Sequence, residues 1–278
     1  MTERSVVNRT PEPRTRQGLT MDLRHLGLHH GDLVLMHASL GSLGWVVGGA
    51  HTVVLALLDV LGDEGTLVVP TQTGDNSDPK DWSRPPVPES WWPVIRAEMP
   101  AYDPRITPCR GMGRIAETVR IWPGACRSAH PQVSFAALGP KALELTADHP
   151  LDDGLGDGSP LGWLYRAGAK VLLLGVGYDR ATAIHLAEYR AAGGPRTTQG
   201  AAALVAGERR WVTYSDIEHL DSDRFFPAIG RDFERVHRVS KGLVGSAEAR
   251  LMHLEDLVDH AVSWMSRHLR PPTDGSQT

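Results

Sequence analysis

The sequence predicts an α/β fold, an α/β/α sandwich with a mixed central sheet in a single large domain. The apolar runs Leu33–His37 and Gly65–Pro70 enclose Ala50–Leu61, whose apolar residues recur at helical spacing. This pattern is typical of a strand–helix–strand unit with parallel strands. A third buried strand is predicted at Lys170–Gly175, and the turn Gly207-Glu208 between two strand-like segments indicates a hairpin. The 278 residues suffice for one such domain.

The chain is expected to divide into a flexible leader at residues 1–17, the folded domain at 18–270 and a disordered tail at 271–278. The leader is polar and arginine-rich and lacks the apolar core of a secretory signal. The other predicted elements are helices at Gly113–Arg120, Pro140–Ala147, Ser159–Tyr165, Asp232–Val239 and Glu248–Arg267, and strands at Val133–Leu138, Ala201–Ala206 and Arg209–Tyr214.

Residues 71–110 form a long loop insertion rich in proline, with tryptophans at positions 82, 91 and 92. Loops of this length inside compact domains usually serve as lids or binding walls, so we expect this one to border the substrate. The tryptophans could pack against a ligand, although each is as readily explained as an anchor of the loop.

Composition excludes several classes of protein. The net charge of −4 argues against binding to nucleic acid, and no apolar run approaches the roughly 20 residues of a membrane helix. Cys109 and Cys126 lack the spacing of metal ligands and fit ordinary thiols in the cytoplasm.

Four segments could carry chemistry. His37-Ala-Ser-Leu-Gly-Ser-Leu-Gly44 leaves a strand and enters a helix, and its hydroxyls and glycines suit either a phosphate ligand or close packing. It fits neither the P-loop nor the dinucleotide fingerprint. His130 precedes Pro131 in a constrained loop, where it could bind a ligand or have a structural role.

The third segment, Thr182-Ala-Ile-His-Leu-Ala-Glu188, follows the strand at Lys170–Gly175. It places an imidazole at the carboxyl end of a strand, where α/β proteins build ligand crevices. His185 and Glu188 share a helix face at i, i+3, which fits a base with a carboxylate, a metal pair or a structural hydrogen bond. The fourth segment, residues 215–224, is acidic and follows the hairpin. It could orient an imidazole, hold a cation or simply be solvated.

Taken together and in this order, these segments resemble the aminoglycoside 3-N-acetyltransferase family, whose antibiotic acetyltransferase fold differs from the GNAT fold. The matching pieces are His37–Gly44, Pro123–Pro131, Ser159-Pro160, Lys170–Gly175 and Thr182–Glu188. The likeness runs from about residue 21 to about residue 269.

The resemblance implies acetyl transfer from acetyl-CoA to the 3-amine of a 2-deoxystreptamine antibiotic, and with it resistance. The family's catalytic histidine falls on His185, and its carboxylate partner is expected at Glu218, with Asp216 or Asp221 as alternatives. Transfer is expected to be direct and to need no metal, with His185 as general base and Thr182 facing the thioester oxygen.

The resemblance also implies ligand contacts. On the coenzyme A side the expected residues are His37, Ser39, Leu40, Gly41, Ser42, Leu43, Gly44, Ser128, His130 and Thr182. Because the antibiotic carries several ammonium groups, its pocket is expected to be acidic and to include Asp75, Asp78, Asp81, Glu188 and Asp221. A monomer or homodimer is expected.

Three other functions remain open at this point. A coenzyme A-dependent acyltransferase of the same fold could act on another amine. A metal-dependent hydrolase could use His185, Glu188, His219 and Asp216. A non-catalytic protein could sequester the antibiotic.

Overall fold

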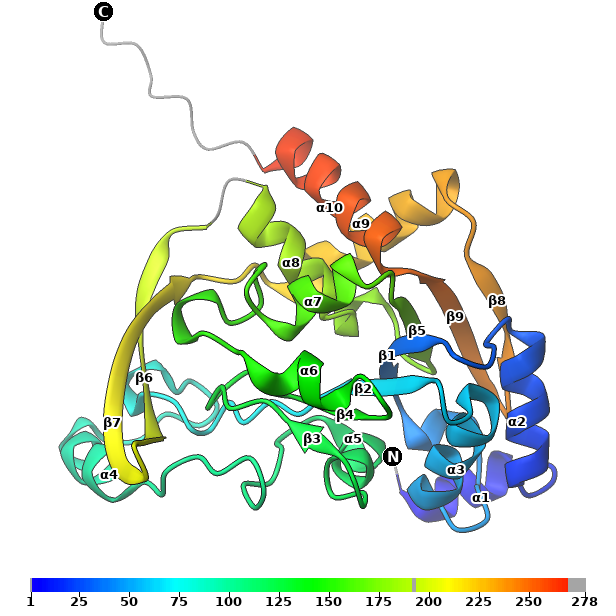
Figure 1. Cartoon of the computed structure of the whole chain (residues 1–278), viewed down its shortest axis with the longest axis horizontal. Helices are drawn as coiled ribbons and strands as arrows, with labels where there is room; N and C mark the ends of the chain where they lie inside the picture. The colour runs from blue at the N-terminus through cyan, green and yellow to red at the C-terminus, as the bar shows by residue number, and fades with distance from the viewer. Residues whose placement is uncertain (1, 192–193, 270–278) are drawn as a thin grey trace, which may run out of the picture.

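The computed structural model describes residues 2–191 and 194–269. A seven-stranded sheet in the order β3-β4-β2-β1-β5-β9-β8 forms the centre of the molecule (Figure 1). Strand β1 pairs in parallel with β2 and β5, and every other pairing in the sheet is antiparallel. The strands are β1 (Leu33–Ala38), β2 (Thr66–Pro70), β3 (Cys126–Arg127), β4 (Phe135–Leu138), β5 (Lys170–Leu174), β8 (Ser240–Val244) and β9 (Ala247–His253).

Helices cover both faces of this sheet, as an α/β/α sandwich requires. One face carries α2 (Arg16–His25), α3 (Ala50–Leu61) and α5 (Gly113–Arg120). The other carries α6 (Ala142–Ala147), α7 (Pro160–Arg166), α8 (Ala183–Arg190), α9 (Ser222–Val236) and α10 (Leu254–His268). The predicted fold class is confirmed.

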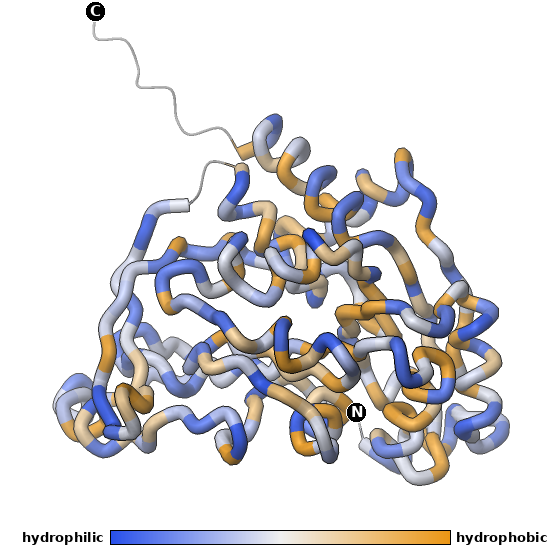
Figure 2. The backbone as a smooth tube through the Cα atoms, viewed as in Figure 1, coloured by the Kyte–Doolittle hydropathy of each residue, from blue (hydrophilic) through white to orange (hydrophobic). Residues whose placement is uncertain are grey.

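The central strands are apolar along their whole length because both of their faces are buried. In β1, Leu33 and Leu35 contribute to the core under α6–α10, whereas Val34 and Met36 contribute to the core under α2, α3 and α5. Hydrophobic residues accordingly concentrate in the central strands and the helix faces that pack on them (Figure 2).

The hairpin strands β6 (Arg196–Val205) and β7 (Glu208–Ile217) form a separate two-stranded sheet that stands away from the central one (Figure 1). The turn residues are Ala206 and Gly207, both with positive φ, as a type I′ turn requires. The turn therefore lies one residue before the predicted position. The antiparallel part of the central sheet comes instead from β3, β4, β8 and β9.

The carboxyl-terminal third differs from the expectation in two places. The predicted helix Glu248–Arg267 begins with strand β9, and α10 starts only at Leu254. The predicted helix Asp232–Val239 is the end of α9, which starts at Ser222. Ala247–His253 consists mostly of good helix formers, but its pairing with β5 and β8 outweighs that preference.

The amino-terminal segment, expected to be a flexible leader, has regular structure. Helix α1 (Glu3–Arg9) is capped by Thr2, and its Val6 is buried. Thr10 accepts a hydrogen bond from the Trp45 amide at 2.9 Å, and Arg14 forms a β-bridge with Val46. These contacts hold the segment against the domain. The expected disordered tail, 271–278, lies outside the described residues.

The long insertion at 71–110 contains helix α4 (Trp92–Glu98) and three-residue 3₁₀ turns at Pro79–Asp81 (η2) and Glu89–Trp91 (η3). It packs against the hairpin: the Asn76 side chain bonds both the amide and the carbonyl of Ala202, and Tyr102 forms a β-bridge with Ala203. The insertion and the hairpin therefore form one joined wall beside the sheet.

Candidate active site

A cavity of about 460 Å³ lies at the carboxyl ends of β1, β2 and β5. Helix α3, which follows β1, packs on one face of the sheet, and α8, which follows β5, packs on the other. Such a switch point opens a crevice at the strand ends. The cavity therefore occupies the position that the sequence predicts for a ligand.

Helix α8 brings His185 to this cavity. After β5 the chain turns at Gly175, where φ is +69° and an added Cβ would lie 2.5 Å from the Ser42 side chain. A 3₁₀ turn, η5 (Tyr178–Arg180), then leads into α8, which has Thr182 at its N-cap. Thr182 and His185 both line the cavity.

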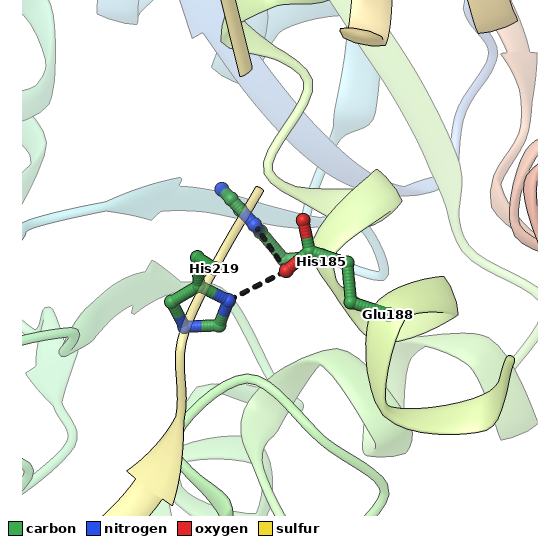
Figure 3. Close-up of side chains that lie close together, drawn as sticks. All are labelled: His185, Glu188 and His219. Carbon is green, nitrogen blue, oxygen red and sulfur yellow. Dashed lines mark hydrogen bonds and ion pairs between the residues drawn. The ribbon is translucent and has the colours of Figure 1, made fainter. Parts of the chain in front are cut away.

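His185, Glu188 and His219 converge on one carboxylate oxygen (Figure 3). The His185 Nδ1 lies 3.1 Å and the His219 Nδ1 lies 2.6 Å from Glu188 Oε2. The other oxygen, Oε1, accepts the Leu220 amide at 3.2 Å. Because an ionised carboxylate can only accept hydrogen bonds, both rings carry a proton on Nδ1, and a neutral His185 then has a free lone pair on Nε2.

Burial and hydrogen bonding act in opposite directions on this group. Burial lowers the pKa of His185, and the hydrogen bond and charge of Glu188 offset part of that effect. Burial also acts to raise the pKa of Glu188, but the hydrogen bonds from His185 and His219 outweigh it and hold that pKa below its ordinary value. At neutral pH the structure therefore has a neutral imidazole beside a buried carboxylate, the combination that a general base requires.

The structure corrects the expected carboxylate partner. Glu218 is exposed, whereas Glu188 is buried and bonded to His185. Asp216 accepts from the Tyr189 hydroxyl at 2.8 Å, and Asp221 caps α9, so neither alternative contacts His185. The i, i+3 spacing on α8 was the decisive signal, because it places both side chains on one helix face.

Glu188 was expected to bind substrate, and its contacts do not support that role. Its side chain is 4% exposed, and both oxygens already accept hydrogen bonds from protein groups. Asp221 likewise uses its side chain to accept from the Arg224 amide.

The loop after β1 borders the cavity only in its first half. His37, Ser39 and Leu40 line it. His37 is buried, its Nε2 has no hydrogen-bond partner among the described residues, and burial lowers its pKa to about 3. A neutral His37 thus faces the cavity near His185.

The second half of this loop has other contacts. Ser42 donates to Ser39 and Gly175 and lines a separate cavity. Leu43 is fully buried, the Gly41 carbonyl accepts from Arg9, and Gly44 has φ +86°. These residues shape the loop rather than the cavity wall.

Ser128 and His130, expected on the coenzyme A side, lie outside the cavity and are internal. The Ser128 hydroxyl accepts from the Phe135 amide at 2.9 Å and contacts His149 Nδ1 at 2.8 Å. His130 Nδ1 accepts from the amides of Gln132 and Val133. Both side chains are buried and organise the turn before β4, which fits the structural alternative for His130.

A second cavity of about 560 Å³ lies along the 71–110 insertion and shares Gln72 with the first. Asp75, Asp81 and Trp82 line it. Asp75 pairs with Arg110 at 3.3 Å and Asp81 lies 3.8 Å from Lys80, so this wall is charge-balanced rather than acidic.

Three other residues of the insertion do not line this cavity. Asp78 is buried in an ion pair with Arg96 at 2.7 Å and caps the turn η2. Trp91 is 57% exposed, and Trp92 contacts Arg96. Asp78 and Trp92 thus anchor the insertion through Arg96, whereas Trp91 does not.

Several cavity residues could not be predicted from the sequence. The segment Gly111–Ala116 supplies one side of the first cavity, including Arg114, and α9 supplies Ser222 and Phe226. These residues match no motif, and only the fold brings them to His185. His219 was considered as a metal ligand alone, and its bond to Glu188 was not anticipated.

Neither cysteine is placed to act as a nucleophile. Both are free, and neither lines the first cavity. Burial, together with the nearby Glu117 carboxylate, raises the pKa of Cys109 to about 12, so its thiol stays protonated at neutral pH.

Among the described residues, His185, Glu188 and His219 form the group whose donor atoms lie close enough together, within 4.8 Å, to hold a metal ion. Their N···O separations of 2.6 and 3.1 Å are those of hydrogen bonds. Ligand atoms at tetrahedral zinc lie about 2.0–2.2 Å from the ion, and hence roughly 3.3 Å from one another. The geometry favours a hydrogen-bonded group.

The family model for aminoglycoside 3-N-acetyltransferase matches residues 35–266. The chain belongs to this family. It is 47% identical over 262 residues to the SPbeta prophage-derived aminoglycoside N(3')-acetyltransferase-like protein YokD of Bacillus subtilis (strain 168), covering 94% of this chain and 96% of that protein. It is 41% identical to aminoglycoside N(3)-acetyltransferase VII of Streptomyces paromomycinus, covering 97% of each.

Solved structures of family members have the same fold. The crystal structure of YokD matches with a TM-score of 0.93 at 46% identity, covering 95% of this chain and 98% of that one. AAC-IIIb in a binary complex with CoASH matches with a TM-score of 0.82 at 32% identity, covering 94% of this chain and 100% of that one. AAC-VIa bound to sisomicin matches with a TM-score of 0.83 at 33% identity, covering 92% of this chain and 98% of that one. The chain is thus an acyltransferase of the aminoglycoside 3-N-acetyltransferase family, and the predicted family is confirmed. No helix in the described part of the chain is long and apolar enough to cross a membrane.

Proposed function

We propose that this enzyme transfers the acetyl group of acetyl-CoA to the 3-amino group of the 2-deoxystreptamine ring of an aminoglycoside antibiotic, and thereby confers resistance. The observation that carries the proposal is the His185–Glu188 hydrogen bond at the edge of the cavity, in a fold shared with relatives bound to CoASH and to sisomicin.

His185 would act as the general base. An ammonium nitrogen has no lone pair, so it must lose a proton before or during attack on the thioester. The free Nε2 of His185 would accept that proton, and the Glu188 carboxylate would stabilise the resulting imidazolium. The amine nitrogen forms its bond to the carbonyl carbon, the carbon–sulfur bond breaks, and the coenzyme A sulfur leaves with the electron pair and takes up a proton.

The two reactants would approach from different sides. Ser39, Leu40 and Thr182 line the part of the first cavity that would receive the acetyl end of acetyl-CoA, with Thr182 facing the thioester oxygen. The aminoglycoside would enter from the second cavity, past Gln72. There Asp75 could exchange Arg110 for an ammonium group of the antibiotic.

Direct transfer without a metal or an acetyl-enzyme fits these contacts. The cavity holds an imidazole base and no cysteine among the described residues. We place the enzyme in the cytoplasm, as a monomer or homodimer, with no nucleic-acid partner. A chelator such as EDTA should therefore leave activity unchanged, and a loss restored by added zinc would contradict the metal-free reaction.

The direct test is incubation of the purified protein with acetyl-CoA and kanamycin or gentamicin. Mass spectrometry should show the gain of one acetyl group, and NMR should locate it on N3. His185→Ala should lower the rate by about 10²–10⁴-fold while calorimetry still detects antibiotic binding. Acetylation only of a non-aminoglycoside amine, or equal loss of binding and transfer in His185→Ala, would overturn the proposal.

A further inference from the structure

The Glu188 oxygen that accepts a hydrogen bond from His185, Oε2, also accepts one from a second imidazole, that of His219. We propose that His219 is a positioning residue for acetyl transfer, holding the Glu188 carboxylate in the orientation that His185 needs. This inference rests on the proposed function, because it assigns His219 a part in the action of the same base. The His219 Nδ1 lies 2.6 Å from Glu188 Oε2, closer than the His185 Nδ1 at 3.1 Å.

The first step concerns the carboxylate. Glu188 is buried, and among the described residues it forms no ion pair with a lysine or an arginine; its ion pairs are with His185 and His219. Its charge is therefore held by three hydrogen-bond donors, two imidazoles and the Leu220 amide. A hydrogen bond to a charged group is stronger than one between neutral groups. The loss of His219 would remove the shortest of the three and leave Oε2 with a single donor.

The second step concerns the ring of His185. His219 packs edge-on against it with ring centroids 4.7 Å apart, and Phe226 does the same at 4.9 Å. Within the described part of the chain, the hydrogen-bond partner of the His185 ring is Glu188. His219 therefore restricts His185 in two ways, by contact with the ring and through the shared oxygen.

The third step concerns the chain segment that carries His219. Residues 218–221 join β7 to α9, and α9 supplies Ser222 and Phe226 to the cavity. The His219 imidazole and the Leu220 amide both bond Glu188, which ties this segment to α8. A purely structural role for His219 would consist in holding this segment against α8. The experiment has to distinguish that role from the positioning of the Glu188 carboxylate.

The side-chain chemistry of asparagine and glutamine provides that separation. The amide nitrogen of asparagine can occupy the place of histidine Nδ1, whereas that of glutamine corresponds to Nε2. If Nδ1–H donation to Glu188 is what matters, His219→Asn should retain function and His219→Gln should not. Both variants keep a polar side chain in the segment, so a merely structural role would not distinguish them.

The experiment compares His219→Ala, His219→Asn and His219→Gln with the wild type and with His29→Ala, an exposed-histidine control. Steady-state rates with acetyl-CoA and the best aminoglycoside should show kcat reduced about 10–100-fold in His219→Ala and His219→Gln. KM for acetyl-CoA should stay unchanged, and His219→Asn should recover most of kcat. Wild-type kcat in His219→Ala, or equal rates in the Asn and Gln variants, would overturn the proposal.

A second readout needs no turnover. NMR titration of the His185 imidazole should show its pKa rising in His219→Ala, because the His219 ring, whose proximity lowers this pKa, and its competing hydrogen bond to Glu188 are both removed. Of the other groups near this ring, His37 has no contribution from His219, whereas Glu188 loses a hydrogen bond that helps to hold its pKa down. An unaltered His185 titration would also contradict the inference. If the wild type acetylates no aminoglycoside, the proposed function fails, yet this titration still decides whether His219 acts on His185.

Discussion

At the scale of single residues, the site depends on which carboxylate meets the imidazole. Glu188 and Glu218 lie thirty positions apart in the chain, and the acidic stretch around Glu218 offered the richer local composition. Helix geometry favours Glu188, because one turn of α8 separates it from His185. The burial of Glu188 adds a second advantage, since an ion pair in a low-dielectric site is electrostatically stronger than one in water.

The two glutamates provide a matched pair of substitutions. Glu188→Gln removes the charge that would stabilise the protonated base and replaces one acceptor oxygen by a donor, so kcat should fall about 10²-fold or more. Glu218→Gln makes the same chemical change at an exposed position and should leave kcat within twofold. Steady-state kinetics with acetyl-CoA and an aminoglycoside check both. Equal effects of the two variants would count against the assignment of Glu188.

The pH dependence of the reaction follows from the pKa of His185. General-base action needs the neutral imidazole, and burial holds the pKa of this ring below its ordinary 6.5. Activity should therefore be level near neutral pH and decline only as the pH falls below 6.5. A profile of kcat/KM between pH 5 and 8 measures this limb. A midpoint above 6.5 would mean that His185 is not the titrating base.

At the scale of elements, the sequence predicted what local patterns determine. Strands β1, β2 and β5 are short apolar runs because both of their faces are buried, and α3 has clear helical spacing. Strand β9 could not be predicted in this way: Ala247–His253 resembles a helix locally, and its partners β5 and β8 decide its conformation.

The same distinction holds for the site. His185 and Thr182 could be placed from the chain because they directly follow a predicted strand. Arg114 and Phe226 line the same cavity from α5 and α9, which no local pattern connects to β5. His219 reaches Glu188 only through the path of the chain after the hairpin.

The contact between the insertion and the hairpin offers a test at this scale. Asn76 is buried, and its amide both donates to the Ala202 carbonyl at 2.9 Å and accepts from the Ala202 amide at 3.0 Å. Asn76→Ala should cost about 1–3 kcal/mol of unfolding free energy by leaving these groups unpaired. It should also raise KM for the aminoglycoside more than KM for acetyl-CoA, because the second cavity lies along this insertion.

Urea denaturation and steady-state kinetics measure the two effects of Asn76→Ala. Asn8→Ala, at an exposed position in α1, is the matched control and should change neither quantity. An equal rise of both KM values would mean that the insertion does not form the aminoglycoside side.

At the scale of the whole molecule, the fold holds several histidines neutral inside the protein. Burial lowers the pKa of His37 and of His149 to about 3, and that of His130 to about 4. His149 is held on both sides: the Ser128 hydroxyl contacts its Nδ1 at 2.8 Å, and its Nε2 lies 2.6 Å from the Gly154 carbonyl. His130 and His149 join the segment before β4 to the loop before α7, so their protonation would act on the structure as a whole.

Acid should therefore destabilise the protein before its carboxylates titrate. Each of these histidines has a folded pKa below the unfolded value of about 6.5, so the unfolded chain binds the extra proton first. The stability they contribute is fully present above pH 6.5 and is lost as the pH falls toward 4, by about 1.4 kcal/mol per pH unit for each ring. Urea denaturation between pH 7 and 5 should show this slope. His149→Gln should reduce this slope by the contribution of one proton, whereas His29→Gln, at an exposed position, should leave it unchanged. An unfolding free energy that is constant between pH 7 and 5 would contradict the burial of neutral histidines.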